Sequence, residues 1–141
     1  MKPYTIKHHE GMLRSVSRDT TIEEIKELEI LSKIEEALKE TWTSGCGLAA
    51  VQVGHPLRFA WFHYSGEEFV LLNPEIIKHG RTKKTKREGC MSIPQRWVNV
   101  RRSYKITVRS AGVVYKFRGQ AARIVQHEVD HMNGVLITDH E

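Results

Sequence analysis

Residues 120–134 read QAARIVQHEVDHMNG, and the rest of the chain is organised around this stretch. It contains no Gly or Pro before its last residue, a glycine placed as a helix C-cap, so the sequence predicts a helix over 120–133. His127 and His131 are four residues apart and share a helix face, where both imidazoles can hold one metal ion with Glu128 beside them. The alternative is two surface histidines on an amphipathic helix, and a third ligand would decide between the two.

Cys90 is a candidate for this third ligand and lies in the segment 88–92, EGCMS. A thiolate and two imidazoles form a tetrahedral metal site whose fourth corner is left for water or substrate, and such an open corner marks a catalytic site. Two alternatives stay open: Cys90 is a small buried hydrophobic residue, or Cys46 is the ligand. These are the only two cysteines, too few for a disulfide scaffold, so each is expected to be a reduced thiol or a metal ligand.

A third segment, residues 45–52 (GCGLAAVQ), is small and apolar apart from its last residue. Its backbone could approach a ligand closely, and Gln52 offers an amide donor. The alternative is an ordinary tight loop that enters a buried strand.

The remaining pattern is a mixture of helix and strand. A first long helix is predicted over 19–42, because Thr21 and Glu24 make a capping-box pattern and apolar residues follow at intervals of three and four. Strands are predicted in four aromatic and β-branched segments, with breaks at Ser65-Gly66 and Asn73-Pro74 and a turn at Ala111-Gly112. These segments are 58–64, 67–77, 105–109 and 113–117. These elements predict an α+β fold, an antiparallel sheet packed against a few helices, in a single domain over 1–141.

The chain is basic, with a formal charge of +5 and a pI near 9.3. Such a surface steers toward anionic partners such as nucleic acid. Basic residues are concentrated in 81–87, a predicted loop that could touch ribosomal RNA, with a solvated charged face as the alternative. The first residues lack an apolar core of signal-peptide length, and no run approaches the roughly 20 apolar residues of a membrane span. We therefore expect a soluble intracellular protein.

Taken together, segments 45–52, 88–92 and 126–131 resemble the three signature motifs of the peptide deformylase family, in that family's order and spacing. The resemblance covers most of the chain. It implies antiparallel sheets packed around a central metal-binding HExxH helix, with an N-terminal helix on the outside. It also implies the family's reaction, removal of the formyl group from the N-terminal formylmethionine of newly made polypeptides with release of formate.

The resemblance further implies a role for each motif residue. The implied ligands of one divalent metal ion per chain are Cys90, His127 and His131. Water is the implied fourth ligand and nucleophile, and Glu128 the general base and acid. The side-chain amide of Gln52 and the backbone N–H of Met91 are implied donors to the oxygen of the tetrahedral intermediate. Fe²⁺ is the expected physiological metal, and Zn²⁺, Ni²⁺ or Co²⁺ can substitute.

For the substrate, the resemblance implies a peptide that lies extended along these segments as an added strand. Small residues leave a tight pocket that admits a formyl group and excludes an acetyl group, and the candidates are Gly45, Gly47 and Gly89. Cys46 and Ile124 are candidates for the wall of the methionine pocket.

Around the ligands, Glu88 and Asp130 are expected to orient the histidines, with Arg101 or Arg102 as counter-ion. Surface ion pairing is the alternative for these four residues.

The chain also departs from the family pattern. It ends at Glu141, whereas common bacterial members continue into a C-terminal helix that docks on the ribosome, and this brevity resembles compact versions carried by some phages. We expect a monomer in the cytoplasm, or in the host cytoplasm if phage-encoded. Its expected partners are N-formylmethionyl peptides and nascent chains, with the ribosome surface contacted through 81–87 and no membrane.

Two rival classes are a metalloprotease of the HExxH type and a structural or peptide-binding metal protein. Cys90 as a ligand argues against the first class. Gln52 and Glu128 argue against the second, because a structural site needs neither a base nor an oxyanion donor.

Overall fold

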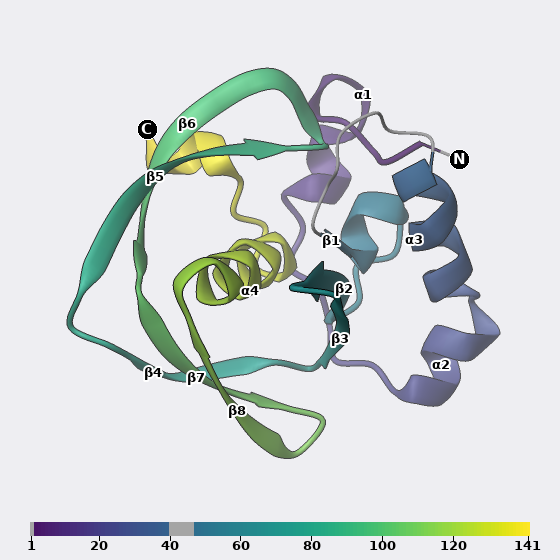
Figure 1. The fold of residues 1–141 in the computed structure, drawn as a ribbon. Coiled ribbons are helices and arrows are strands. Elements are labelled where there is room, and N and C mark those ends of the chain that lie inside the picture. The colour runs from purple at the N-terminus through teal and green to yellow at the C-terminus, as the bar shows by residue number, and fades with distance from the viewer. Residues whose placement is uncertain (1, 40–46) are drawn as a thin grey trace.

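Helix α4 (Gly119–Met132) lies in the middle of the molecule, and the other elements surround it (Figure 1). The computed structural model describes residues 2–39 and 47–141. The helix predicted over 120–133 is confirmed within one residue at each end. Asn133 is its C-cap and Gly134 follows with φ +73°, the left-handed conformation that glycine adopts without a steric penalty.

Three antiparallel sheets enclose α4. The first has the order β1-β2-β3, formed by Gly47–Ala49, Phe59–Tyr64 and Glu67–Leu72. The second has the order β4-β7-β8, formed by Glu75–His79, Lys105–Ser110 and Val113–Arg118. The third is the hairpin of β5 (Lys83–Cys90) and β6 (Ile93–Ser103). The predicted α+β class, with antiparallel sheets around the HExxH helix, is therefore confirmed.

Two hairpins turn at the dipeptides that the sequence marked as turns. Ser65 and Gly66 have φ of 52° and 80°, and Ala111 and Gly112 have φ of 50° and 78°. Two consecutive positive φ values are the signature of a type I′ turn, whose twist matches that of the flanking strands. The register of β2 with β3 and of β7 with β8 thus follows from local sequence.

The helix predicted over 19–42 is wrong as a single element. Two helices occupy this region, α2 (Ile22–Glu27) and α3 (Ile30–Lys39), and positions 40–42 lie outside the described residues. The helical conformation is interrupted at Glu29, whose φ is 53°. Because the break rotates α3, Ile30 is buried and Leu31 is 40% exposed, contrary to the regular apolar stripe.

The cap of α2 is half of the predicted capping box. The Thr21 hydroxyl accepts a hydrogen bond from the Glu24 N–H at 3.1 Å. The Glu24 carboxylate turns instead to Arg18 and Thr20.

The basic stretch 81–87 was predicted to be a loop, and this is also wrong. From Lys83 onward it is strand β5, paired with β6 from Lys83 opposite Ser103 to Cys90 opposite Ile93. Its charged residues lack the alternation of apolar and polar side chains that predicts a strand. Cross-strand pairing with β6 stabilises the extended conformation, and its burial is confined to the end near Cys90.

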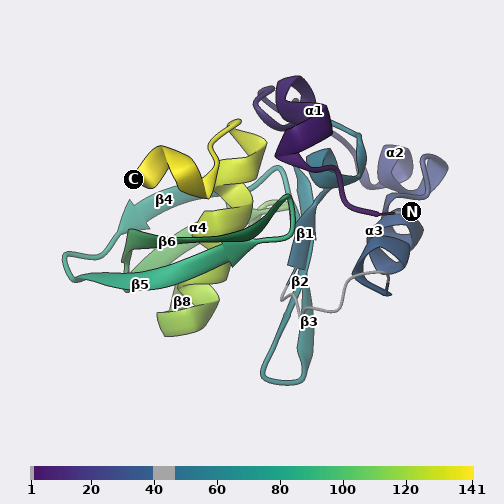
Figure 2. The same cartoon turned by 90° about the horizontal axis from the view of Figure 1, so that it is seen from above.

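The main core lies between α4 and the first two sheets, where Ala122, Val125 and Val129 pack against residues such as Phe62 and Val108. Helices α2 and α3 cover the outside of β1 and the 3₁₀ helix η1 (Ala50–Val53), as expected for an N-terminal helical layer (Figure 2). The remaining helical elements are α1 (Ile6–Leu13) and η2 (Ile137–His140). Within the described residues, no helix is long and apolar enough to cross a membrane.

Candidate metal centre

The three predicted ligands converge on one point. Cys90 stands at the end of β5, just before the Met91-Ser92 turn, and both histidines lie on α4. The Cys90 Sγ is 3.4 Å from the His131 Nε2, which is 3.2 Å from the His127 Nε2. All three donor atoms lie within 4.8 Å of one another.

These distances fit a metal ion. Bonds of about 2.0–2.1 Å to nitrogen and 2.3 Å to sulfur in a tetrahedron separate two ligand atoms by roughly 3.3–3.6 Å. One thiolate and two imidazoles are also ligands that several first-row transition metals accept. The geometry therefore supports Cys90 as the third ligand, and the competing candidate, Cys46, lies outside the described residues.

The electrostatics of the cluster favour a thiolate. Burial opposes ionisation of Cys90, but the imidazoles of His131 and His127 outweigh it and hold the pKa of the thiol well below its usual range. A thiolate is the form of cysteine that binds metals. Burial likewise opposes protonation of His127, whose pKa is nevertheless raised by Cys90 and Glu88 in the metal-free chain.

Glu88 orients the first histidine. Its carboxylate is 8% exposed and accepts a hydrogen bond from the His127 Nδ1 at 3.0 Å. With the proton on Nδ1, the lone pair of Nε2 is free to face the cluster. Two arginines bind the same carboxylate, Arg102 at 2.7 and 3.0 Å and Arg123 at 2.6 Å. Burial disfavours the charged carboxylate, but His127 and Arg102 lower its pKa overall.

This network answers two open questions from the sequence. Arg102 is the counter-ion of Glu88, whereas Arg101 has no acidic partner in the described part of the chain. Asp130 pairs with Arg102 and with His140, each at 2.9 Å, and so helps to hold Arg102 in position. Arg123 was missed as a site residue, although it lies one turn before His127 in a stretch, Ala122-Arg123, that also matches the family pattern.

Glu128 is buried beside the cluster, and one of its two carboxyl oxygens makes no hydrogen bond to the described residues. It is 3% exposed, and its Oε1 has no partner among the described residues. Burial raises the pKa of this carboxyl group, although the nearby histidines oppose the rise. A buried carboxyl group that is not committed to another residue can exchange protons with a ligand.

The side-chain amide of Gln52 is held in one orientation. Its Oε1 accepts a hydrogen bond from the Ala49 N–H at 3.0 Å, and its Nε2 donates to the Ser92 hydroxyl at 3.0 Å. The same nitrogen is 3.8 Å from the Cys90 Sγ. Gln52 therefore presents N–H donors to the metal centre, beside Met91 in the turn that follows Cys90. Ser92 was not predicted, since it joins Gln52 only through the fold.

Of the five predicted substrate residues, the structure describes three, and each of these packs against other residues of the protein. Gly45 and Cys46 lie outside the described residues. A Cβ at Gly47 would meet Phe62, and one at Gly89 would lie 2.6 Å from the Trp97 ring, so both glycines are required by packing within the protein. Ile124 is 6% exposed and belongs to the main core.

A partly buried Cys-His-His cluster beside a buried glutamate, on an α+β fold, is the arrangement of a mononuclear metallohydrolase. The family model described as "Polypeptide deformylase" matches residues 4–141. The chain belongs to this family, whose members are metallohydrolases.

Curated relatives agree with the family assignment. A peptide deformylase of Dictyoglomus thermophilum is 38% identical over 123 residues, covering 77% of this chain and 80% of the relative. One from Thermotoga maritima is 40% identical over 118 residues, covering 79% and 72%.

Solved structures share the fold. The crystal structure of peptide deformylase from Thermotoga maritima has a TM-score of 0.83 at 30% identity, covering 99% of this chain and 95% of that one. A probable peptide deformylase from Synechococcus phage S-SSM7 has a TM-score of 0.83 at 30% identity, with coverages of 100% and 99%. A class I type b peptide deformylase from Acinetobacter baumannii, bound to Met-Ala-Ser, has a TM-score of 0.86 at 25% identity, with coverages of 100% and 98%.

Proposed function

We propose that this chain removes the N-formyl group from the N-terminal formylmethionine of new polypeptides and releases formate. The observation that carries the proposal is the convergence of Cys90, His127 and His131 beside the uncommitted carboxyl group of Glu128. The Acinetobacter relative supports it, because Met-Ala-Ser is the kind of peptide that deformylation leaves.

Cys90, His127 and His131 would hold one divalent metal ion. When bound, the ion would lower the pKa of a water molecule toward neutrality and polarise a carbonyl oxygen. We propose Fe²⁺ as the physiological metal, with Zn²⁺, Ni²⁺ or Co²⁺ able to substitute, because a thiolate and two imidazoles suit all four. Glu88 keeps the His127 proton on Nδ1 and so keeps Nε2 available as a ligand atom.

Glu128 is the proposed general base and acid. Its carboxylate accepts a proton from the attacking water as the water oxygen bonds to the formyl carbon. The same proton passes to the amine nitrogen as the C–N bond breaks, so a neutral amine leaves, and the formic acid that remains ionises to formate by losing its proton to solvent. Burial, which raises the pKa of Glu128, brings its proton affinity closer to that needed for both steps at neutral pH.

Gln52 and Met91 are the proposed donors to the formyl oxygen. As the formyl carbon becomes tetrahedral, its oxygen gains negative charge that N–H groups can stabilise. The bond from Ala49 to the Gln52 Oε1 ensures that Nε2, and not the oxygen, faces Cys90. This preorganisation avoids the cost of reorienting the amide during the reaction.

The substrate is proposed to add as a strand beside β1. Within the described residues β1 pairs with no strand other than β2, so its other edge is the proposed place for the substrate strand. Main-chain pairing there would give affinity with little sequence preference. Gly45, Gly47 and Gly89 are proposed to leave room for the formyl group, with Cys46 and Ile124 in the wall of the methionine pocket.

The test is formate release from formyl-Met-Ala-Ser by protein loaded anaerobically with Fe²⁺. Wild type should release formate from this peptide and none from acetyl-Met-Ala-Ser. Glu128→Gln should bind the same amount of metal and lose at least about 100-fold in rate. If wild type holds its metal and releases no formate, the proposed reaction is wrong.

Three wider expectations remain proposals. The chain is proposed to form one domain and to act as a monomer in the cytoplasm. The ribosome surface is proposed as a partner through residues 81–87, whose Lys and Arg side chains are exposed. Co-sedimentation with ribosomes at 50 and 200 mM salt, about the range over which phosphate contacts weaken strongly, tests this contact.

A further inference from the structure

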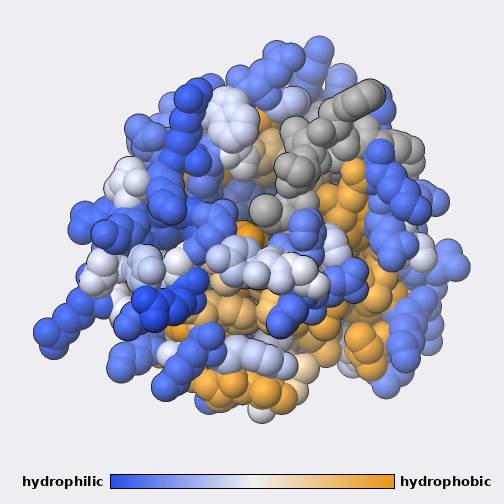
Figure 3. Space-filling model, in the orientation of Figure 1, coloured by the Kyte–Doolittle hydropathy of each residue, from blue (hydrophilic) through white to orange (hydrophobic). Residues whose placement is uncertain are grey.

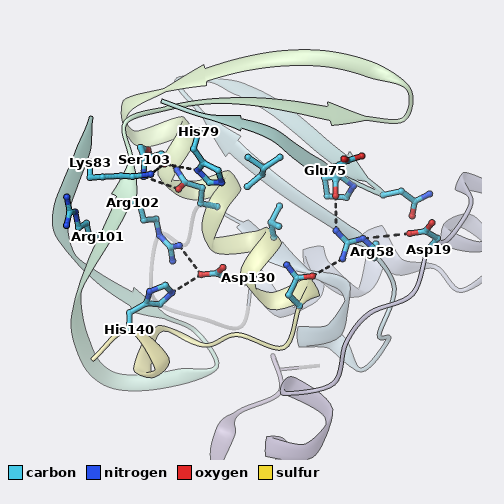
Figure 4. Close-up of a pocket in the computed structure, with 16 residues that line it drawn as sticks. Asp19, Arg58, Glu75, His79, Lys83, Arg101, Arg102, Ser103, Asp130 and His140 are labelled. Atoms are coloured by element: carbon cyan, nitrogen blue, oxygen red, sulfur yellow. Dashed lines mark hydrogen bonds and ion pairs between the residues drawn. The ribbon is translucent and has the colours of Figure 1, made fainter. Parts of the chain in front are cut away.

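A polar cavity of about 960 Å³ lies against α4, and its lining includes none of Cys90, His127 and His131. Figure 4 shows Lys83, Ser103 and His79 together at one end, and Arg58, Glu75 and Asp19 together at the other. The two ends therefore differ in charge, and the first end contains no acidic residue.

Ser103 is fixed in the wall of the first end. It is 3% exposed, its N–H donates to the Gln126 Oε1 at 3.1 Å, and its carbonyl oxygen accepts from the Gln126 Nε2 at 2.8 Å. Because Gln126 belongs to α4, the central helix sets the position of the Ser103 hydroxyl.

Two further side chains meet at this hydroxyl. The Lys83 Nζ donates to the Ser103 Oγ at 2.6 Å, and the His79 Nδ1 lies 2.7 Å from the same oxygen. An ammonium group can only donate, so the hydroxyl accepts from Lys83, and the hydroxyl can in turn donate to the Nδ1 of a neutral His79. In that arrangement the imidazole carries its proton on Nε2. The lowered pKa of His79, caused by partial desolvation and the nearby Lys83, agrees with this state.

This arrangement leaves several donors unused. Lys83 has two more N–H groups and no other acceptor in the described part of the chain, and His79 keeps its Nε2–H. Arg101, which also lines the cavity, lies two residues before Ser103 on the same face of the β5–β6 hairpin. Because Lys83 lies opposite Ser103, Arg101 is the diagonal neighbour of Lys83 across the hairpin, and such neighbours lie about 7–8 Å apart, within reach of one tetrahedral anion.

The acidic residues of the cavity are committed elsewhere. Asp130 is paired with Arg102 and His140. Asp19 lies near Arg58, and Glu75 pairs with Arg109, both at the far end. They leave the Lys83 end with an uncompensated positive charge.

The surrounding chain strengthens this field. Residues 76–118 contain 13 Lys and Arg and a single acidic residue, Glu88, whereas the rest of the chain has 9 Lys and Arg against 16 Asp and Glu. In Figure 3 hydrophilic side chains cover the part of the surface where Figure 1 places β5 and β6. A positively charged surface of this kind attracts anions.

We propose that Lys83, His79, Arg101 and the backbone-anchored Ser103 form a binding site for a phosphate group, at the cationic end of the cavity. The ligand chemistry is a phosphate oxyanion, which accepts charge-assisted hydrogen bonds from ammonium and guanidinium groups. It comes either from free phosphate and phosphomonoesters or from the phosphodiester backbone of RNA.

The first experiment titrates metal-loaded, ¹⁵N-labelled protein with inorganic phosphate at constant ionic strength and follows the backbone amides. Saturable shifts are expected around His79, Lys83 and Ser103. Lys83→Ala and Arg101→Ala should each weaken binding by about 10-fold, the loss expected for one charge-assisted hydrogen bond. Lys116→Ala is the matched control, because Lys116 is an exposed lysine on β8 outside the cavity, and it should change binding less than about 2-fold. Thermal melts confirm that each variant is folded.

A second arm separates the two sources. A fluorescent single-stranded RNA of ten nucleotides is titrated by anisotropy at several salt concentrations. If Lys83→Ala lowers RNA affinity more than Lys116→Ala and reduces the salt slope by about one, the phosphate belongs to RNA. If RNA affinity is equally sensitive to both variants while phosphate affinity responds to Lys83 alone, the ligand is a free phosphate or monoester.

Two results overturn the proposal. One is the absence of a saturable phosphate shift at His79, Lys83 and Ser103, including the case in which shifts gather only around Cys90. The other is equal weakening by Lys83→Ala, Arg101→Ala and Lys116→Ala, which indicates attraction by net charge alone.

Discussion

The indole ring of Trp97 fills the space beside the α-carbon of Gly89, one residue before the candidate metal ligand Cys90. In the pairing of β5 with β6, Glu88 lies opposite Val98 and Cys90 opposite Ile93, so Gly89 alone faces the four residues 94–97. This bulge brings Trp97, which is 58% exposed, back over Gly89.

We predict that Gly89→Ala lowers the free energy of unfolding by about 1–3 kcal/mol, because the new methyl group overlaps the ring. Adding Trp97→Ala should recover part of this loss. The measurement is a double-mutant cycle by urea unfolding. Gly11→Ala is the control, since a Cβ there meets nothing within 4 Å, and it should be neutral or slightly stabilising. Additive effects of the two substitutions would show that the contact with Trp97 is unimportant.

Glu88→Gln should weaken metal binding by about 10–100-fold, because the neutral amide no longer holds the proton on the His127 Nδ1. It should also destabilise the fold by about 3–5 kcal/mol, since Arg102 and Arg123 lose their buried counter-ion. Competition with a chromophoric chelator measures the metal affinity. Asp130→Asn is the control: it also contacts Arg102 but is more exposed, and metal affinity should change less. Equal effects would contradict the assignment.

Gln52→Ala should reduce the rate of formate release about 100-fold, with metal content unchanged, because one donor to the formyl oxygen is lost. Ser92→Ala removes only the hydroxyl that accepts from the Gln52 Nε2, so it should have a smaller effect. Steady-state kinetics on both variants check this order. A Ser92→Ala rate as low as that of Gln52→Ala would place the critical donor at Ser92.

Glu128→Gln should make the metal-free protein more stable while it abolishes activity. Glu128 is buried and one of its two carboxyl oxygens has no hydrogen-bond partner among the described residues, so a neutral side chain of the same shape avoids the desolvation cost of a carboxylate. The expected gain is on the order of 1 kcal/mol, measured by urea unfolding at neutral pH. A loss of stability would mean that Glu128 has a structural partner.

Acid should weaken the contact between Arg18 and Glu24. Hydrogen bonds from Arg18 and Thr20 lower the pKa of Glu24 from 4.5 to about 2. A lowered folded-state pKa contributes stability that is fully present above about pH 4.5 and is lost as the pH falls toward 2. The melting temperature of metal-free wild type should therefore fall more between pH 5 and 2 than that of Glu24→Gln. Glu23→Gln, one position earlier, should behave like wild type.

Local features of the chain were predictable because their causes lie within a few residues. The i, i+4 spacing of His127 and His131 needs only a helix to become a metal-binding pair. The turns at Ser65-Gly66 and Ala111-Gly112 needed only residues that tolerate positive φ. The third candidate ligand, Cys90, was predictable because segments 45–52, 88–92 and 126–131 occur in the order and spacing of the peptide deformylase motifs.

Other features depend on contacts between distant segments. Strand β5 is extended because β6 pairs with it, and its own charged residues carry no strand pattern. The break at Glu29 follows the packing of two helices that a single periodic stripe cannot reveal.

The sequence by itself thus determined the fold class, the central helix and the three candidate ligands that the structure brings together, because these follow from residue spacing and from three linked motifs. Only the tertiary structure decided that Arg102 and Arg123 neutralise Glu88, that Ser92 and Ala49 orient the Gln52 amide, and that Gly89 makes room for Trp97. Each of these contacts joins residues whose partners are chosen by packing, and side-chain direction at such contacts is set in three dimensions and not by neighbours along the chain.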